Sequence, residues 1–256
     1  MKHTSKTPYL LVSDLDDTLL GNEKALRRFR DFYQSECSDL LTLVYASGRF
    51  ADSIRNDVLT TDLPEPAYII GGVGSEIRRF QGHAIVEEWE ASMSDNWSAE
   101  IVRETLGDID EMKLQPGDSQ SAFKVSYLYP NATPKHLDDI QNRLSGAGLK
   151  TNLIYSSQRD LDVLPHGVDK GTAAEFIAGH MGYSNQQVIT AGNSGNDFTL
   201  MEHGFRGIVV ANAHGELHRR ADGNIGIYQS PKEVADGVQD GVRYWLNRLD
   251  MDIRHG

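Results

Sequence analysis

Two aspartates separated by one residue, Asp14 and Asp16, stand directly after a short apolar run at residues 9–12. Such a run is expected to form a buried parallel strand, and open α/β sheets bind ligands at the carboxyl ends of their strands. At this spacing both carboxylates can point into one crevice. Either aspartate alone would more simply cap a helix or serve a turn. The complete string Asp-x-Asp-x-Thr, followed by apolar residues, favours a reactive site instead.

Paired carboxylates at this place suit phosphoryl transfer, which needs a nucleophile in line with the leaving oxygen. We expect Asp14 to be that nucleophile and to form an aspartyl-phosphate intermediate. Asp16 would act first as general acid toward the leaving alkoxide and then as general base toward water. The chemistry also calls for a hard cation beside the phosphoryl oxygens.

Three later segments supply the remaining parts of such a site. The Ser47 hydroxyl and the Gly48 N–H can hold phosphoryl oxygens near a helix N-terminus. Lys170, expected to open a helix, provides a cation for an anionic substrate. The loop at residues 191–197, rich in Gly and Asn, can ligate or orient a metal. Each segment also has an ordinary interpretation, namely a capped turn, an exposed lysine and a glycine-rich turn.

The composition narrows the class of protein. Of the 256 residues, 39% are hydrophobic, as in ordinary globular domains, and the net charge is −12. An acidic surface argues against nucleic-acid and anionic-lipid partners. Cys37 is the only cysteine, so an internal disulfide and a cysteine zinc site are excluded. The polar start and the short first apolar run predict a soluble, cytoplasmic protein without a signal peptide or membrane span.

Short apolar runs alternate with amphipathic stretches, which predicts an α/β fold with a parallel sheet and helices on both faces. The expected strands are residues 9–12, 41–46, 67–70, 187–190 and 207–210. The expected helices are residues 22–36, 50–59, 170–181, 197–202 and 231–249.

The middle of the chain has a different pattern. A hairpin is expected over residues 76–89, with its turn at 81–83. Helices at 94–106 and 134–147 and strands at 123–129, 150–155 and 160–164 would follow. Gly82 and the stretch 165–167 are plausible hinges. We therefore expect a core formed by residues 1–81 and 167–256, with an inserted α+β domain at 82–166.

The order Asp-x-Asp, Ser, Lys and Gly-Asn-x-Gly-Asn-Asp between residues 14 and 197 resembles the haloacid dehalogenase superfamily of phosphotransferases. A narrower similarity, over about residues 9–212, is to sucrose-6-phosphate phosphatases of the cyanobacterial and plant type. The bacterial mannosylfructose-phosphate phosphatases share this layout. The segments that carry this similarity are residues 11–18, 45–49, 74–77, 123–127 and 156–165.

The resemblance implies a Mg²⁺-dependent phosphatase with a Rossmann-like core and a cap domain that grips the sugar. The implied metal ligands are Asp14, the backbone carbonyl of Asp16, Asn193 and Asp197. Asn193 departs from the aspartate usual in the family, so we expect weaker metal binding. The implied contacts to the sugar without phosphate are Glu76, Lys124, Arg159 and Asp162, although Lys124 and Arg159 could instead serve the cap's own surface.

The favoured hypothesis is hydrolysis of a phosphorylated disaccharide, with sucrose 6-phosphate as the first candidate and mannosylfructose 6-phosphate as the second. Two alternatives of other classes stay open: a non-catalytic sugar-phosphate sensor, and a phosphotransferase or mutase. The expected partner is a small sugar phosphate. A contact with the sugar-phosphate synthase of the same pathway is a further possibility.

Overall fold

The computed structural model describes residues 8–93 and 95–255 and contains a seven-stranded sheet. Its strand order is β11-β10-β9-β1-β2-β3-β4, and all neighbours are parallel except β3 and β4. The predicted α/β class and parallel sheet are confirmed. The strands are β1 (Tyr9–Ser13), β2 (Leu41–Ala46), β3 (Tyr68–Gly71), β4 (Glu76–Arg79), β9 (Val188–Gly192), β10 (Arg206–Val209) and β11 (Ile227–Gln229).

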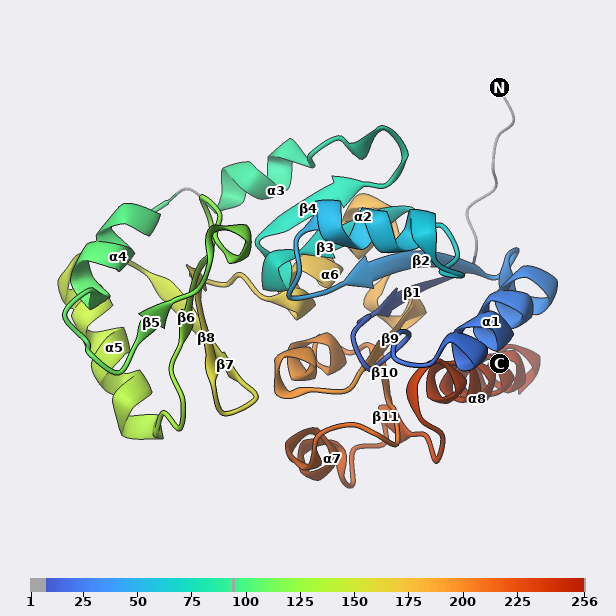
Figure 1. The fold of residues 1–256 in the computed structure, drawn as a ribbon. Coiled ribbons are helices and arrows are strands. Elements are labelled where there is room, and N and C mark those ends of the chain that lie inside the picture. The colour runs from blue at the N-terminus through green and yellow to red at the C-terminus, as the bar shows by residue number, and fades with distance from the viewer. Residues whose placement is uncertain (1–7, 94, 256) are drawn as a thin grey trace.

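Helices cover both faces of this sheet because its central strands are apolar on both sides (Figure 1). Leu11 of β1 packs in the layer that holds α1 (Glu23–Phe32), α2 (Ala51–Thr60) and α8 (Val234–His255). Leu10 and Val12 pack in the opposite layer, with α3 (Glu87–Ser92) and α6 (Lys170–His180). Continuous burial of β1 thus fixes where its carboxyl end, and with it Asp14, emerges.

A second, antiparallel sheet has the strand order β5-β6-β8-β7 and lies at the left in Figure 1. Its strands are β5 (Lys113–Leu114), β6 (Val125–Leu128), β7 (Thr151–Ser156) and β8 (Asp160–Pro165). The helices α4 (Ala99–Leu106) and α5 (Pro134–Gly146) share a separate apolar core with this sheet. We call this α+β unit the cap. The domain boundaries at 82 and 166 stay a prediction.

The hairpin predicted over residues 76–89 is wrong in its second half. Residues Glu87–Ser92 form α3, and only one bridge, between Arg78 and Ile85, joins the two segments. The apolar side chains at 86, 89 and 93 recur at helical spacing and pack against the seven-stranded sheet. The Trp89 indole also donates to the Gly74 carbonyl at 2.9 Å. The turn at 81–83 does form, but burial of one helical face replaces the strand that was expected after it.

Other elements differ from expectation in smaller ways. The helix expected at 197–202 is a 3₁₀ segment, η6 (Gly195–Met201). The short elements β5, β11 and α7 (Gly215–Ala221) were not predicted, because they are too brief to show a period. Position 94, where the first cap helix was expected to start, lies outside the described residues. Within the described residues, no helix is long and apolar enough to cross a membrane.

Candidate active site

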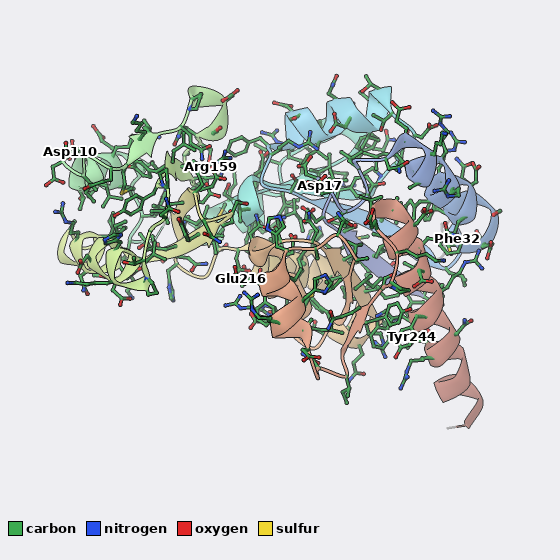
Figure 2. The ribbon with its side chains drawn as sticks, turned by 60° about the horizontal axis from the view of Figure 1, so that its bottom comes forward. Asp17, Phe32, Asp110, Arg159, Glu216 and Tyr244 are labelled. Atoms are coloured by element: carbon green, nitrogen blue, oxygen red, sulfur yellow. The ribbon has the colours of Figure 1, made fainter. Side chains whose placement is uncertain are left out.

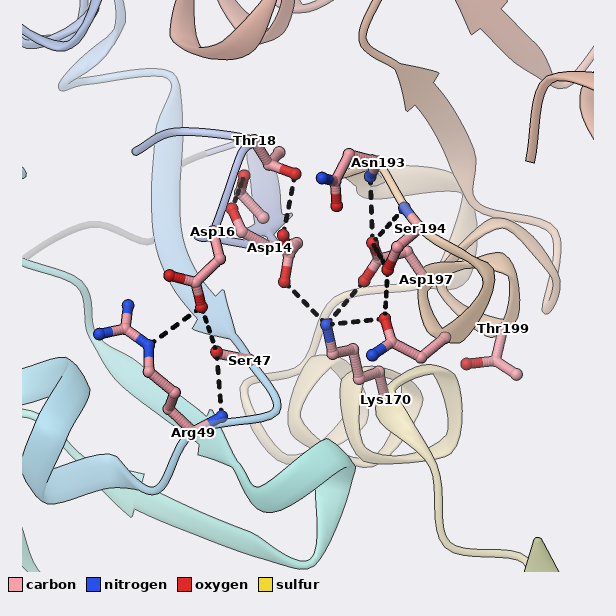
Figure 3. A network of polar contacts seen from close by, with 12 residues as sticks. Asp14, Asp16, Thr18, Ser47, Arg49, Lys170, Asn193, Ser194, Asp197 and Thr199 are labelled. Atoms are coloured by element: carbon pink, nitrogen blue, oxygen red, sulfur yellow. Dashed lines mark hydrogen bonds and ion pairs between the residues drawn. The ribbon is translucent and has the colours of Figure 1, made fainter. Parts of the chain in front are cut away.

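A buried lysine joins two carboxylates at the carboxyl ends of β1 and β9 (Figure 3). The Lys170 Nζ lies 2.7 Å from Asp14 Oδ1 and 2.7 Å from Asp197 Oδ1. All three side chains are at most 7% exposed. The Thr18 hydroxyl donates to the other oxygen of Asp14 at 2.8 Å. Residues more than 150 positions apart in sequence thus meet at one point, as the sequence predicted for Asp14 and Lys170.

Local sequence places Lys170 at the first position of α6. Asp169 caps this helix and accepts from the Thr172 N–H at 2.9 Å. Gly171 has no side chain, and a Cβ there would collide with the Thr199 carbonyl. The Gly171 N–H instead donates to the Thr199 hydroxyl at 3.2 Å. The start of α6 can therefore lie directly against η6, which brings the lysine to Asp197.

Two carboxylates against one ammonium leave the cluster with an excess negative charge. Burial, followed by the charge of Asp197, raises the pKa of Asp14 to about 7, against the hydrogen bonds from Lys170 and Thr18. Burial opposes the charge on Lys170, but Asp14 and Asp197 outweigh it and raise the pKa of the lysine. The lysine stays charged, and the cluster can take up one further positive charge, either a proton or a metal ion.

The Asp16 carboxylate is more open, with its side chain 57% exposed. Its Oδ2 accepts from the Ser47 hydroxyl at 3.3 Å and from Arg49 Nε at 3.0 Å. Arg49 is held in turn by Asp57 of α2 at 2.6 Å. Sequence reasoning assigned no role to Arg49, although it directly follows Ser47-Gly48 at the end of the second predicted strand. The structure therefore adds Arg49 to the residues at this site.

Asp197 holds the loop after β9 in place through hydrogen bonds to its backbone. The Asp197 Oδ2 accepts from the backbone N–H groups of Asn193 at 3.0 Å and Ser194 at 2.9 Å. A Cβ on Gly192 would collide with the Asp197 side chain, so the close approach requires glycine. Asp197 is fully buried, whereas Asn193 and Ser194 line the cavity described next. Both oxygens of Asp197 are thus already used by the protein.

A cavity of about 1030 Å³ lies between the core and the cap. The core side includes Asp14, Asp16, Gly48, Lys170 and Asn193. The cap contributes mostly polar side chains, among them Gln115, Ser119, Gln120, Lys124, Arg159 and Asp162. Figure 2 shows Arg159 on the side of the cap nearer to Asp17, whereas Asp110 lies at its far end. Ser47 is fully buried behind this surface.

The four residues expected to contact the sugar all line this cavity, but they differ in burial and in the partners that they already contact. Lys124 and Asp162 are buried and paired at 3.1 Å, and Lys124 Nζ lies 5.3 Å from the centre of the Phe50 ring. Arg159 is 63% exposed and pairs with its neighbour Asp160.

Glu76 is engaged within the core. One of its oxygens accepts from the Ala51 N–H at the start of α2, and the other pairs with Arg78 at 3.2 Å. Its carboxylate therefore helps to fix the residues that begin α2 next to the cavity.

The donor atoms at this site fit a hard cation such as Mg²⁺, although among the described residues no group of three or more His, Cys, Asp or Glu side chains is arranged to hold a metal ion. The candidate donors are oxygen atoms of three kinds, only one of them a carboxylate: an Asp14 carboxylate oxygen, the Asp16 backbone carbonyl and the Asn193 side-chain amide. Figure 3 shows the Asn193 side chain beside Thr18 and Asp14. The excess negative charge of the buried cluster supports this fit.

The chain is similar to known proteins over most of its length. The profile of the family described as sucrose-6F-phosphate phosphohydrolase matches residues 7–246. A mannosylfructose-phosphate phosphatase from Agrobacterium fabrum is 33% identical over 92% of this chain and 96% of its own length. Sucrose-phosphatase 2 from Nicotiana tabacum is 31% identical, and the chain spans only 59% of its length.

Solved structures of phosphatases and related hydrolases also resemble this chain. The sucrose-phosphatase from Synechocystis sp. PCC6803, in complex with sucrose and phosphate, is 30% identical with a TM-score of 0.86 over 93% of this chain and 98% of that one. A haloacid dehalogenase-like hydrolase from Bacillus subtilis, 19% identical with a TM-score of 0.66, shares the fold. The expected haloacid dehalogenase fold and phosphoric monoester hydrolase class are thereby confirmed, and the chain belongs to the sucrose-6F-phosphate phosphohydrolase family.

Proposed function

We propose that the chain is a Mg²⁺-dependent phosphatase that hydrolyses a phosphorylated disaccharide, with sucrose 6-phosphate as the favoured substrate. One observation carries this proposal: Asp14 and Lys170 meet at 2.7 Å on the core side of a cavity whose opposite side is formed by polar cap residues. Phosphoryl chemistry thus takes place at one end, and the cap can contact the sugar at the other.

In the first step, an Asp14 oxygen attacks phosphorus and the bond from phosphorus to the sugar oxygen breaks. Asp16 donates a proton to the departing alkoxide. In the second step, Asp16 takes a proton from a water that attacks the aspartyl phosphate, which releases inorganic phosphate and restores Asp14. Lys170, the Gly48 N–H and Ser47 bind the phosphoryl oxygens. Since the Ser47 hydroxyl now donates to Asp16, substrate must replace Asp16 as its acceptor.

Asp14, the Asp16 carbonyl and Asn193 would hold Mg²⁺ directly, and when bound the ion offsets negative charge on the phosphoryl oxygens. Asp197 was expected among the ligands. Unlike Asp14, Asp197 does not line the cavity, and its oxygens face Lys170 and the backbone N–H groups of Asn193 and Ser194, so we assign it the role of orienting the Asn193 loop.

The cap residues support a disaccharide as the substrate class. A disaccharide offers many hydroxyl groups, and charged side chains such as Lys124, Arg159 and Asp162 form strong hydrogen bonds with hydroxyls. The sucrose-phosphatase structure supports sucrose 6-phosphate. The Agrobacterium relative, 33% identical over nearly its whole length, supports mannosylfructose 6-phosphate as the second candidate. A cytoplasmic location and a contact with the synthase that makes the substrate are also proposals.

The test is phosphate release with Mg²⁺ from sucrose 6-phosphate, mannosylfructose 6-phosphate, fructose 6-phosphate and glucose 6-phosphate, comparing kcat/KM. We expect strong preference for one disaccharide and no release by Asp14→Asn. Equal activity on the monosaccharides would contradict a cap that recognises a disaccharide. Binding without turnover would identify a sensor, and transfer to a sugar acceptor in place of water would identify a phosphotransferase or mutase.

A further inference from the structure

A short segment after β10, residues 211–214, contacts three separate parts of the molecule around the site. The Asn212 side-chain amide donates to the Asp17 carbonyl at 2.8 Å and accepts from the Val234 N–H, at the start of α8, at 2.8 Å. The His214 N–H donates to the Asn193 carbonyl at 2.8 Å. This segment therefore connects the loop after β1 to the loop after β9, and both to α8.

The loop that Asn212 contacts is a tight turn. The N–H groups of Thr18, Leu19 and Leu20 all point to the Leu15 carbonyl, at 3.1, 3.0 and 2.8 Å. Asp17 has a φ of +56°, in the left-handed region, which costs most non-glycine residues about 1 kcal/mol, although aspartate tolerates it better. The hydrogen bond from Asn212 is made to the carbonyl of this left-handed residue.

The same turn positions the reactive groups. Thr18, the residue after Asp17, donates its hydroxyl to Asp14 at 2.8 Å, and Asp16 precedes Asp17. A rotation of the Asp17 peptide would therefore shift the Asp14 carboxylate and the Asp16 carbonyl together, relative to the Asn193 loop.

We propose that Asn212 is a positioning residue that fixes the Asp14–Thr18 turn relative to the loop after β9. The inference rests on the proposed function, because it assigns importance to the turn that carries Asp14 and Asp16. Its amide is needed as both donor and acceptor. The carboxylate of Asn212→Asp can still accept from the Val234 N–H, but it cannot donate to the Asp17 carbonyl. This substitution separates the link to the turn from the attachment of α8.

The experiment compares Asn212→Asp and Asn212→Ala with Asn224→Ala. Asn224 is a matched control because its side chain accepts from the Gly226 N–H at 2.9 Å in the turn before β11 and does not line the cavity. The measurements are kcat and KM for phosphate release, amide hydrogen exchange of peptides that cover residues 14–20, and the melting temperature.

For Asn212→Asp we expect a fall in kcat of at least about tenfold, since misplacement of reacting groups by about 1 Å can cost about 100-fold, with KM changed by less than about threefold. Exchange at residues 14–20 should become faster, while the melting temperature stays close to that of Asn224→Ala. Asn224→Ala should keep the parental kcat and the parental exchange at this turn.

Parental kcat and unchanged exchange in Asn212→Asp would overturn the proposal, because Asn212 would then serve only to attach α8. If Asn212→Asp does not fold, Asn212→Ala is judged by its kcat and by its exchange at residues 14–20. If the parent protein releases no phosphate from any sugar phosphate, yet exchange at residues 14–20 rises only in the Asn212 variants, the proposed function fails and the positioning role stands.

Discussion

Replacement of Lys170 by methionine tests the electrostatic basis of the site. The parent cluster buries two carboxylates around one ammonium, with Lys170 1% exposed and Asp14 and Asp197 7% and 0% exposed. Methionine keeps most of the volume of the lysine and removes its charge. Two buried carboxylates would then face each other without a cation. Removing one partner of a buried ion pair is strongly destabilising because the remaining charge is left buried without compensation.

The expected loss of stability is about 3–5 kcal/mol, typical of removing one partner from a buried pair. It should depend on pH. The pKa of Asp14 is about 7 in the folded parent, against an ordinary value of 3.8, so the folded state binds this proton more tightly than the unfolded state. The contribution of Asp14 to stability therefore falls as pH rises from 3.8 through 7. Without Lys170 the pKa of Asp14 rises further, so the loss should be larger at pH 8 than at pH 5.

Activity should fall for the same reason. A protonated Asp14 is no nucleophile, and the phosphoryl group also loses a buried cation. We expect phosphate release at pH 7 to decrease by roughly 10²–10³-fold, the effect of removing one preorganised charge-stabilising group. The assays are phosphate release with saturating Mg²⁺, and urea unfolding at pH 5 and pH 8.

Lys232→Met is the matched control. Lys232 is 58% exposed and pairs with Asp240 at 3.3 Å, so its removal should cost about 0–1 kcal/mol and leave phosphate release unchanged. The reasoning is refuted if Lys170→Met turns over within tenfold of the parent at pH 7. It is also refuted if Lys170→Met is no less stable than the Lys232 variant.

The metal and sugar ends of the cavity give two further predictions. Asn193→Asp adds a charged donor beside Asp14, so less Mg²⁺ should be needed for half-saturation, measured by calorimetry and by activation; an unchanged midpoint would exclude the amide as a ligand. Asp162→Asn leaves the buried Lys124 ammonium beside a neutral amide, so KM for sucrose 6-phosphate should rise about tenfold while turnover of a small aryl phosphate is unchanged. Equal loss on both substrates would show that Asp162 serves cap stability rather than sugar binding.

The chemistry of this protein is largely encoded in contiguous segments. Residues 9–18 contain both the apolar strand and the carboxylates that follow it, and the continuous apolar run suffices to predict that the carboxylates emerge at the end of a buried strand. Lys170 could be predicted in the same way, since it stands at the start of a capped helix. The order of these segments also carried the resemblance to the family, which the profile match then confirmed.

Contacts between distant segments were decided only by the tertiary structure. The sequence of residues 191–197 does not show that the Asp197 oxygens accept hydrogen bonds from Lys170 and from backbone N–H groups. These contacts depend on how closely α6 approaches η6. Likewise, Asn212 meets Asp17 across 195 positions of sequence, and Arg49 meets Asp16 across 33. The local sequence can specify which side chains follow the end of a strand. Their hydrogen-bond partners in the folded protein depend on packing between elements that are far apart in the chain.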